Sequence, residues 1–350
     1  MSVLQTQIAL PVLGQARLRP VFAQGPRSLE SLRLLRISVT DRCNLRCAYC
    51  MPEEGVKFQP KEELLTPREI YEVARVARSL GVTHVKITGG EPTIRRDLPE
   101  ILEGIFELDF EDVSLTTNGL QLRRSASLLR RCGVDRLTIS LDSLQPDRYA
   151  QITGGGRLDL VWDGIAAAEE AGFDRLKINV VVLRGINDDE VGAFAELAVE
   201  HPWTIRFIEY MPLGESRMNE LSRTGEVGLL ASSEVRRRIE ASVGELSAIE
   251  RKQEPGVGPA EVFTNEQLQG RVGFISAMSQ PFCDQCNRLR LTARGELRAC
   301  LFDGGEIDVR AFVRPHVRAT ELRNAFTQCT QQKPITHGVH GNRQMSQLGG

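Results

Sequence analysis

The sequence predicts an α/β protein, a partial (β/α)6 TIM-like barrel followed by a small C-terminal α+β appendage that carries cysteines. Short β-rich runs alternate with longer stretches whose apolar residues recur every three or four positions, which is typical of parallel β/α units. Six such units fit between residues 33 and 240, whereas a complete eight-stranded barrel needs roughly 250 residues. A doubly wound open sheet is the alternative architecture.

The expected elements follow in order along the chain. The predicted strands are Leu34–Val39, Val85–Thr88, Val113–Thr116, Arg136–Ser140, Leu176–Leu183 and Thr204–Ile208. The first helix begins after Thr66 as the N-cap, with Pro67 at its first position, and Gly81 ends it. The other predicted helices are Asp97–Leu108, Gln121–Arg131, Leu158–Ala171 and Asp188–Glu200.

The pattern changes after about residue 250, where Gly256, Gly258 and Pro259 interrupt the chain. Short strands are then expected near Val262 and over Val272–Ile275, Leu289–Thr292 and Glu296–Ala299. We therefore predict three parts. They are an N-terminal arm over 1–30, a barrel over 31–250, and a C-terminal domain over 251–350 with a second cysteine set and a Gly-Gly tail.

Composition narrows the classes of function. Hydrophobic residues make up 41% and charged residues 26% of the 350, which is typical of a globular protein. The net charge of −2 gives no overall field for nucleic acid or anionic lipid, so local cations must hold any anionic ligand. No run approaches the ~20 apolar residues of a membrane span, and the N-terminus lacks a signal-peptide pattern. We expect a cytoplasmic protein without nucleic-acid or membrane partners. In that compartment the eight cysteines are expected to be metal ligands or redox groups rather than disulfides.

The first cysteine set, C-x3-C-x2-C, comes directly after the first predicted strand and consists of Cys43, Cys47 and Cys50. Closely spaced thiolates select iron–sulfur clusters or zinc. A structural zinc site takes four ligands, so three cysteines on one loop favour a [4Fe–4S] cluster with one iron open to a small chelating ligand. A zinc knuckle with a distant fourth ligand is the alternative.

The second cysteine set, C-x2-C-x13-C, consists of Cys283, Cys286 and Cys300 and again has three members. A second cluster with an open iron is the favoured interpretation, and Cys329 as a fourth ligand is the alternative. Arg288 and Arg290 lie between these cysteines on a predicted strand, so both guanidinium groups share one face. Guanidinium groups suit phosphate or guanine acceptors, although an edge strand protected by charge would show the same pattern.

The first cysteine set, with an aromatic residue before its last member, and the turn Gly89-Gly90-Glu91-Pro92 together resemble the motifs of the radical S-adenosylmethionine (SAM) superfamily. In that superfamily the amino and carboxylate groups of SAM chelate the open iron. One electron then cleaves SAM to methionine and a 5′-deoxyadenosyl radical. Both motifs follow the C-terminal ends of predicted strands, where barrel active sites lie. Gly89 and Gly90 would let the backbone approach a ligand closely.

From about Leu34 to Gly350 the chain resembles one family more closely, the GTP 3′,8-cyclases of molybdenum-cofactor biosynthesis. The segments that carry this resemblance include Leu-Arg-Ile-Ser-Val-Thr-Asp-Arg-Cys-Asn-Leu-Arg-Cys, Ile-Thr-Gly-Gly-Glu-Pro, Leu-Thr-Thr-Asn-Gly, Arg-Phe-Ile-Glu-Tyr-Met, Cys-x-x-Cys-x-Arg-x-Arg and the terminal Gly-Gly. The resemblance implies a radical SAM lyase that forms a carbon–carbon bond. It removes the 3′ hydrogen of GTP and joins C3′ to C8, giving (8S)-3′,8-cyclo-7,8-dihydro-GTP, the first step towards molybdopterin.

The resemblance also implies two [4Fe–4S] clusters and roles for particular residues. The first cysteine set would hold the SAM cluster, and the open iron of the second cluster would bind guanine. The expected SAM contacts are Tyr49, Gly90, Ser140 and Met211. The expected GTP contacts are Arg36, Lys86, Thr116, Lys177, Arg206, Arg288, Leu289 and Arg290. The expected catalytic residues are Arg288, Arg290, Gly349 and Gly350.

The implied partners are a flavodoxin- or ferredoxin-like electron donor and a downstream cyclic pyranopterin monophosphate synthase, and the chain would be a monomer or homodimer. Two other functions compete with this reading. A radical SAM enzyme with an auxiliary cluster that modifies a peptide usually carries more C-terminal cysteines. A non-enzymatic zinc or iron–sulfur protein leaves the Gly-Gly-Glu-Pro turn unexplained.

Overall fold

The structure is a computed structural model. It describes residues 25–350 except 53, 57, 59, 225–226, 251–252, 303–305, 339, 342, 344 and 350. Most of the predicted arm over 1–30, and the predicted catalytic residue Gly350, therefore lie outside the described residues. None of the helices in the described part of the chain is long and apolar enough to cross a membrane.

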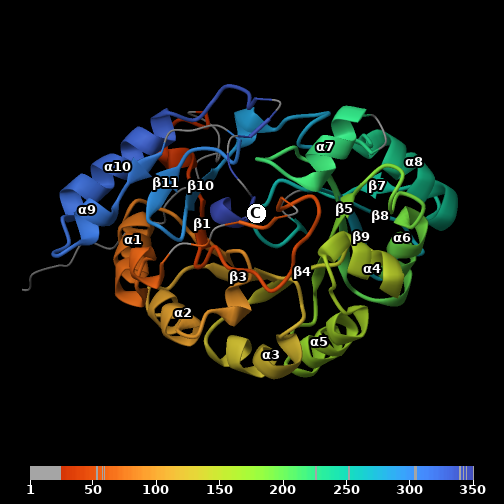
Figure 1. Ribbon diagram of the computed structural model, residues 1–350, viewed down its shortest axis with the longest axis horizontal. Coiled ribbons are helices and arrows are strands. Elements are labelled where there is room, and N and C mark those ends of the chain that lie inside the picture. Colours follow the sequence, from red (N-terminus) through yellow and green to blue (C-terminus); the bar gives the residue numbers. More distant parts are fainter. Residues whose placement is uncertain are drawn as a thin grey trace, which may run out of the picture.

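One twelve-stranded sheet forms the centre of the molecule, in the order β12-β11-β10-β1-β2-β3-β4-β5-β6-β9-β8-β7. The strands from β10 to β9 in this order pair in parallel. Their bounds are β10 Arg288–Leu291, β1 Leu34–Ser38, β2 His84–Thr88, β3 Asp112–Thr117, β4 Arg136–Ser140, β5 Lys177–Val182, β6 Thr204–Glu209 and β9 Arg271–Ile275. The sheet curls inside a ring of helices (Figure 1), which confirms the predicted α/β partial barrel.

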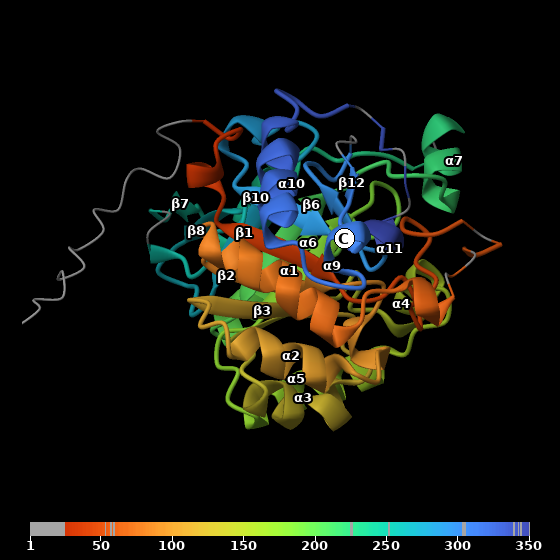
Figure 2. The same ribbon diagram turned by 90° about the vertical axis from the view of Figure 1, so that its left-hand side faces the viewer.

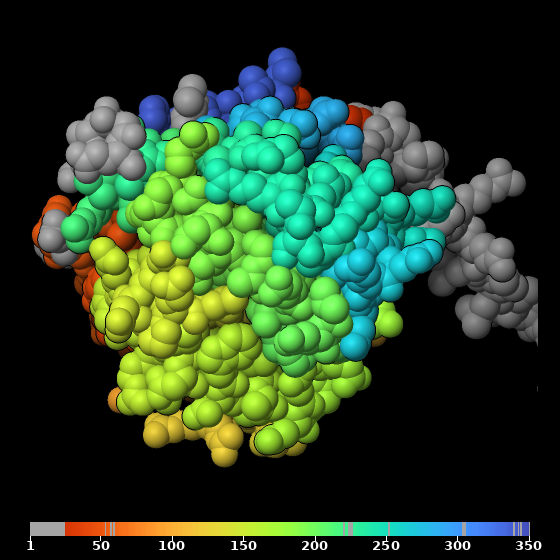
Figure 3. Space-filling view, turned by 90° about the vertical axis from the view of Figure 1, so that its right-hand side faces the viewer, coloured from red at the N-terminus to blue at the C-terminus, as the bar shows by residue number. Residues whose placement is uncertain are grey.

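Five helices of the ring lie where the sequence predicts them, whereas α4, α7 and α8 were not predicted. The bounds of the ring helices are α1 Pro67–Ser79, α2 Leu98–Phe106, α3 Leu122–Arg131, α4 Pro146–Thr153, α5 Leu158–Glu170, α6 Val191–Glu200, α7 Arg217–Thr224 and α8 Ser232–Val243, with short 3-10 turns at Leu29–Ser31, Lys61–Glu63, Pro92–Ile94 and Cys283–Gln285. The predicted cap of α1 is confirmed, because Thr66 and Glu69 exchange side chain to backbone hydrogen bonds in a capping box. On the side of the molecule shown in Figure 3, the segments from α4 to α8 form most of the outer wall.

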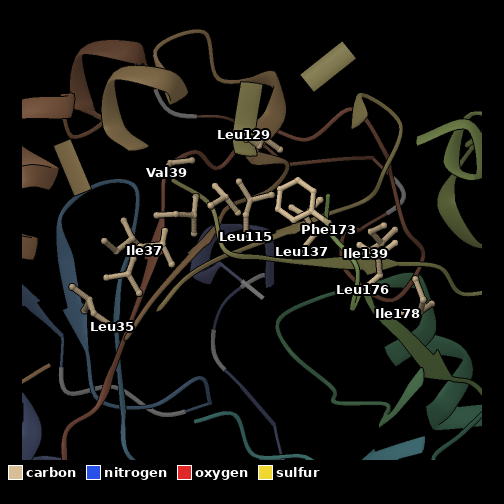
Figure 4. Packing of buried hydrophobic residues seen from close by; sticks show 14 of the residues in the cluster. Leu35, Ile37, Val39, Leu115, Leu129, Leu137, Ile139, Phe173, Leu176 and Ile178 are labelled. Atoms are coloured by element: carbon tan, nitrogen blue, oxygen red, sulfur yellow. The ribbon is translucent and has the colours of Figure 1, made fainter. Parts of the chain in front are cut away.

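The hydrophobic core lies between the strands and this ring. Leu35 and Ile37 of β1, Leu115 of β3 and Leu137 of β4 point outward into it and are fully buried, as Figure 4 shows. Since side chains alternate along a strand, the residues between these positions point into the barrel. Polar residues such as Arg36 therefore occupy the inner face, and this alternation creates the site described below.

The chain after residue 243 extends both edges of the sheet. Strand β9 pairs with β6, while β10 pairs with β1 at the opposite edge. The remaining elements are β7 Ser247–Ala248, β8 Glu261–Thr264, β11 Glu296–Arg298, β12 Ile307–Asp308, α9 Arg310–Val313, α10 Ala319–Gln331 and α11 Met345–Leu348. Helix α10 packs beside α1 (Figure 2), and the dark blue α11 lies inside the ring in Figure 1. The division into a barrel and a C-terminal domain at residue 250 stays a prediction.

Candidate active site

The first cysteine set lies on the loop that leaves the C-terminal end of β1. The backbone N–H of Cys50 donates to the carbonyl of Cys47 at 2.9 Å, and the N–H of Leu45 donates to the Cys43 sulfur at 3.4 Å. Burial raises the pKa of all three thiols, that of Cys50 to about 12, and the thiols also act on one another. Protonated thiols are poor ligands, so this loop needs a strongly polarising metal group to hold its sulfurs as thiolates.

The Gly-Gly-Glu-Pro turn packs directly against that loop. A Cβ on Gly90 would lie 2.3 Å from the carbonyl oxygen of Arg42, and one on Gly89 would lie 2.8 Å from that of Thr40. The buried carboxylate of Glu91 accepts hydrogen bonds from the Thr117 hydroxyl at 2.8 Å and the Asn118 N–H at 2.7 Å. The turn therefore joins the ends of β1, β2 and β3, and its glycines make room for the cysteine loop.

An acidic group lies on the inner side of the first cysteine set. The Tyr49 hydroxyl donates to Asp142 at 2.7 Å, and the N–H of Val181 donates to the other carboxylate oxygen at 2.8 Å. Burial raises the pKa of Asp142 to about 6, so this carboxylate is still mostly ionised at neutral pH. Asp142 and Tyr49 both line the central cavity.

The second cysteine set lies across the barrel, beside β10, and its surroundings are cationic. Arg288 approaches the Cys286 sulfur at 3.9 Å, and the Lys333 ammonium donates to the Cys286 carbonyl at 2.7 Å. Burial raises the pKa of Cys286, but the two cations outweigh burial and leave that pKa at about 7. A large fraction of this thiol is therefore thiolate before any metal binds.

The two cysteine sets fit clusters better than single ions. Within the described residues, no three His, Cys, Asp or Glu side chains converge closely enough to hold one metal ion. A four-iron cluster is larger than an ion and spreads its thiolate ligands around it. The first set lies on one loop, whereas Cys283 and Cys286 precede β10 and Cys300 follows β11. Three cysteines in each set fit two iron–sulfur clusters.

A cavity of about 230 Å³ occupies the middle of the barrel, lined by the second cysteine set and by Tyr49 of the first cysteine loop. Its lining includes most of the residues that the sequence places at the SAM and GTP sites. These are Tyr49, Ser140, Met211, Arg36, Lys86, Thr116, Arg206, Arg288 and Arg290, together with Cys283, Cys286 and Cys300. Residues from both ends of the sequence therefore converge on one space, as the alternation on β1 to β6 and β10 predicts.

Cations crowd the inner face of this cavity. Lys86 and Arg206 both donate to the Thr138 hydroxyl, at 3.1 and 3.2 Å. Burial lowers the pKa of Lys86 well below its usual value, with Arg206 and Arg36 contributing. Burial and Arg136 likewise bring the pKa of Arg206 down to about 10, although Glu254 opposes the shift. Like charges held this close favour a polyanionic ligand.

Polar atoms without partners also face the cavity. The hydroxyl of Thr116, the amide oxygen of Asn179 and Nε of Arg206 are buried and make no hydrogen bond. All three residues line the cavity. Because buried polar atoms are nearly always satisfied, these atoms indicate that a polar ligand completes the site.

The C-terminal tail enters the same space. Arg290 donates to the carbonyl of Gly349 at 3.0 Å, and Gly349 has φ +71° beside Ser38 and Thr88. Arg343 pairs with Glu296 at 2.5 Å and with Glu306 at 2.8 Å, which ties the tail to the β11 hairpin. Glu306 also pairs with Arg298, which is fully buried. The hairpin that leads to Cys300 thus also fixes the start of the tail.

Three expected contacts lie elsewhere than the sequence suggests. Gly90 does not line the cavity and contacts the cysteine loop instead. The Leu289 side chain is fully buried in the core, because it alternates with Arg288 and Arg290. Lys177 lines a neighbouring, larger cavity. Backbone contacts of Gly90 and Leu289 with ligands stay predictions.

Sequence reasoning missed three polar residues of the cavity, Asp142, Asn179 and His337. Asn179 could have been found, because it lies two residues after Lys177 on a predicted strand and so shares its inward face. Asp142 comes after the end of β4, where only the loop conformation decides its direction.

Two family models together match most of the chain. Residues 37–198 match the radical SAM superfamily, and residues 203–339 match the family Molybdenum Cofactor Synthesis C. The boundary between these matches lies close to the start of β6.

Curated relatives match along nearly their whole length. GTP 3′,8-cyclase of Pelotomaculum thermopropionicum is 45% identical over 326 residues, covering 92% of this chain and 98% of the relative. The enzymes of the same name from Thermodesulfovibrio yellowstonii and Moorella thermoacetica are 40% and 42% identical, again covering 92% of this chain and 98% of theirs.

Solved structures share the fold at low sequence identity. Streptococcus suis SuiB bound to its precursor peptide SuiA superposes with a TM-score of 0.57 at 16% identity, covering 87% of this chain. The chain spans 65% of the SuiB length. At this identity the likeness supports the radical SAM fold and nothing further.

Proposed function

The chain belongs to the GTP 3′,8-cyclase family, and from that premise we propose which of its residues hold the cofactors and the substrate. It is a radical SAM enzyme with two [4Fe–4S] clusters that converts GTP to (8S)-3′,8-cyclo-7,8-dihydro-GTP, the first step of molybdenum-cofactor biosynthesis. The peptide-modifying alternative shares only the fold with this chain, at 16% identity.

The proposal gives the two cysteine sets different tasks. Cys43, Cys47 and Cys50 would hold the cluster that binds SAM, and that cluster would supply the electron for the cleavage of SAM. Tyr49, Ser140 and Met211 line the cavity next to this set and would position SAM. Asp142 adds a carboxylate that suits the positive sulfonium of SAM.

The substrate would lie between the two sets. Cys283, Cys286 and Cys300 would hold a second cluster near the guanine. Arg36, Lys86 and Arg206, with Thr116, would bind the ribose and phosphates, and Arg288 and Arg290 would anchor the guanine side. The crowding of cations in an otherwise nearly neutral protein supports this arrangement most directly.

The chain itself contributes positioning and protection. A cavity anchored at both ends holds sugar and base of one molecule in reacting geometry, which lowers the entropic cost of ring closure. The tail, held at Gly349 by Arg290, would limit access of water to the cavity. Gly349 lies against Arg290 and has no side chain, so the tail would reach the reacting groups without filling the space that the substrate needs.

The reaction also needs an electron donor and an enzyme that consumes the product. A flavodoxin- or ferredoxin-like protein would supply the electron, and a cyclic pyranopterin monophosphate synthase would take the product. We place these reactions in the cytoplasm, where thiols and clusters stay reduced.

The direct test is turnover by protein reconstituted without oxygen. With SAM, dithionite and GTP, mass spectrometry should detect 5′-deoxyadenosine and cyclised GTP together, and Cys43→Ala should abolish both. 5′-Deoxyadenosine without a GTP product would overturn the substrate assignment. Neither product, from protein that holds about eight irons, would overturn the reaction class.

A further inference from the structure

The segment 253–257 lies at the end of the barrel opposite to the first cysteine set, and Val257 accepts a hydrogen bond from Asn287, next to the second set. It belongs to the loop that connects β7 to β8, and Figure 2 shows these two strands far from α7 and α11. Three cations at the first positions of their strands hold the loop. Lys177 of β5 and Arg136 of β4 donate to the carbonyl of Pro255 at 3.1 and 3.2 Å, and Arg271 of β9 donates to that of Gln253 at 3.1 Å.

Glu254 in this loop bridges two of the cations. One carboxylate oxygen lies 2.6 Å from the Lys177 ammonium, and the other accepts from Arg271. The Lys177 side chain is 8% exposed and that of Glu254 12%, whereas that of Arg271 is 26% exposed. The carboxylate therefore stands between an inner and an outer cation.

The inner cation faces the space that adjoins the substrate cavity. Lys177 and Glu254 line a cavity of about 590 Å³, which shares Arg206, Phe282 and Arg288 with the central cavity. The two spaces therefore meet at the cations that would bind phosphate. A ligand with its base near the second cysteine set and an extended anionic chain would reach Lys177.

Both Glu254 and Lys177 are mainly ionised at neutral pH. Burial raises the pKa of Glu254, but Lys177 and Arg271 outweigh burial and leave that pKa lowered. Burial lowers the pKa of Lys177 to about 8, with Arg206 adding to the effect and Glu254 opposing it. At neutral pH Glu254 thus supplies the counter-charge that Lys177 lacks when no substrate is present.

We propose that Glu254 is an internal competitor for the phosphates of the nucleotide, which occupies Lys177 in the free protein and is displaced when the triphosphate binds. The inference rests on the proposed function, because it assumes that GTP fills the cavity. The carboxylate need not enter water on displacement, since Arg271 already holds its second oxygen. Ligands with fewer charges compete less well, so Glu254 makes affinity depend on the number of phosphates.

The test compares nucleotide affinities of reconstituted protein without SAM, so that no turnover occurs. Equilibrium dialysis should show that Glu254→Gln binds GTP about fivefold more tightly than wild type, since one competing ion pair is removed. The gain should shrink for GMP and vanish for guanosine, which has no phosphate. In a Lys177→Met background, Glu254→Gln should give no gain, because the cation for which it competes is gone.

Two further variants separate competition from simple support of the loop. Arg271→Gln should weaken GTP binding, because the displaced carboxylate loses its outer partner. If Glu254 only braces the loop, both Glu254→Gln and Arg271→Gln would weaken binding. Glu261→Gln, which changes an exposed carboxylate lining the same cavity, should alter the GTP affinity less than twofold.

Each outcome decides the question. Tighter GTP binding by Glu254→Gln, with unchanged guanosine binding, supports the proposal. Unchanged or weaker GTP binding, or an equal gain for guanosine, overturns it. Failure of the wild-type protein to bind GTP would instead overturn the proposed function. That result comes from the wild-type sample alone and does not depend on the variants.

Discussion

The two cysteine sets offer the same ligands in opposite electrostatic surroundings. Around the first set, the Asp142 carboxylate accepts from the Tyr49 hydroxyl, and burial raises the pKa of every thiol. Around the second, Arg288 and Lys333 outweigh burial at Cys286. The difference matches the molecules proposed to bind there. SAM carries a positive sulfonium, whereas GTP carries a polyanionic triphosphate.

The comparison teaches that ligand identity alone does not define a cluster site. Both sets have three cysteines next to a parallel strand, so the number of ligands predicts the same kind of cluster at both places. We expect the residues around each set to decide which small molecule its cluster would bind. The following predictions test this difference, beginning with the largest expected effect.

Removing one cysteine from each set should separate the two tasks completely. Cys43→Ala should form no 5′-deoxyadenosine at all. Cys286→Ala should keep about four of about eight irons and still cleave SAM, but give no cyclised GTP. Iron analysis and mass spectrometry of both products measure this, and product formation by Cys286→Ala at the wild-type rate would show that the second set is dispensable.

Exchanging one charged residue at each end should separate the affinities. Asp142→Asn should weaken SAM binding and leave GTP binding within twofold, while Arg290→Ala should do the reverse and retain both clusters. Hydrogen bonds to charged groups contribute about 1.5–3 kcal/mol, so each loss should be roughly 10- to 100-fold in Kd. Each variant is the control for the other, and equal effects on both ligands would contradict the division.

The smallest effect concerns thiol reactivity in metal-free protein. At pH 7 Cys286, with a pKa of about 7, should be roughly half thiolate, whereas Cys50, with a pKa of about 12, should be almost entirely thiol. Iodoacetamide should therefore label Cys286 faster, and its rate should level off above about pH 8 while that of Cys50 keeps rising. Peptide mass spectrometry follows both sites.

A matched variant sharpens this last measurement. Lys333→Met removes a cation that stabilises the Cys286 thiolate, so the labelling profile of Cys286 should move to higher pH. That of Cys50, across the barrel, should not move. A shift of both profiles would indicate a general loss of structure instead.

Much of the fold could be predicted because it depends on local signals. The six strands of the barrel begin and end within two residues of their predicted limits, and Thr66 caps α1 as its position before Pro67 indicates. The pairing of β9 with β6 and of β10 with β1 could not be predicted. Parallel pairing between distant segments leaves no local mark in the sequence.

The candidate site shows the same limit. Arg36, Lys86 and Arg206 could be placed on the inner face because strand alternation decides their direction. Asp142 and Glu254 lie in loops, where direction depends on tertiary contacts. The glycines of the Gly-Gly-Glu-Pro turn were expected to admit a ligand, yet Gly90 leaves room for the carbonyl of Arg42. A second chain segment and a ligand both require a glycine where they approach the backbone closely, so the sequence does not distinguish them.

The position of β9 and β10 at opposite edges of the parallel strands also affects the risk of aggregation while the protein is being synthesised. While the chain is being synthesised, β1 and β6 emerge early, and each has one unpaired edge until residues 271–291 follow. An open strand edge invites pairing with other chains. A nascent barrel is therefore most exposed to aggregation late in translation, and a message cut short before codon 271 would yield a product with both edges still bare.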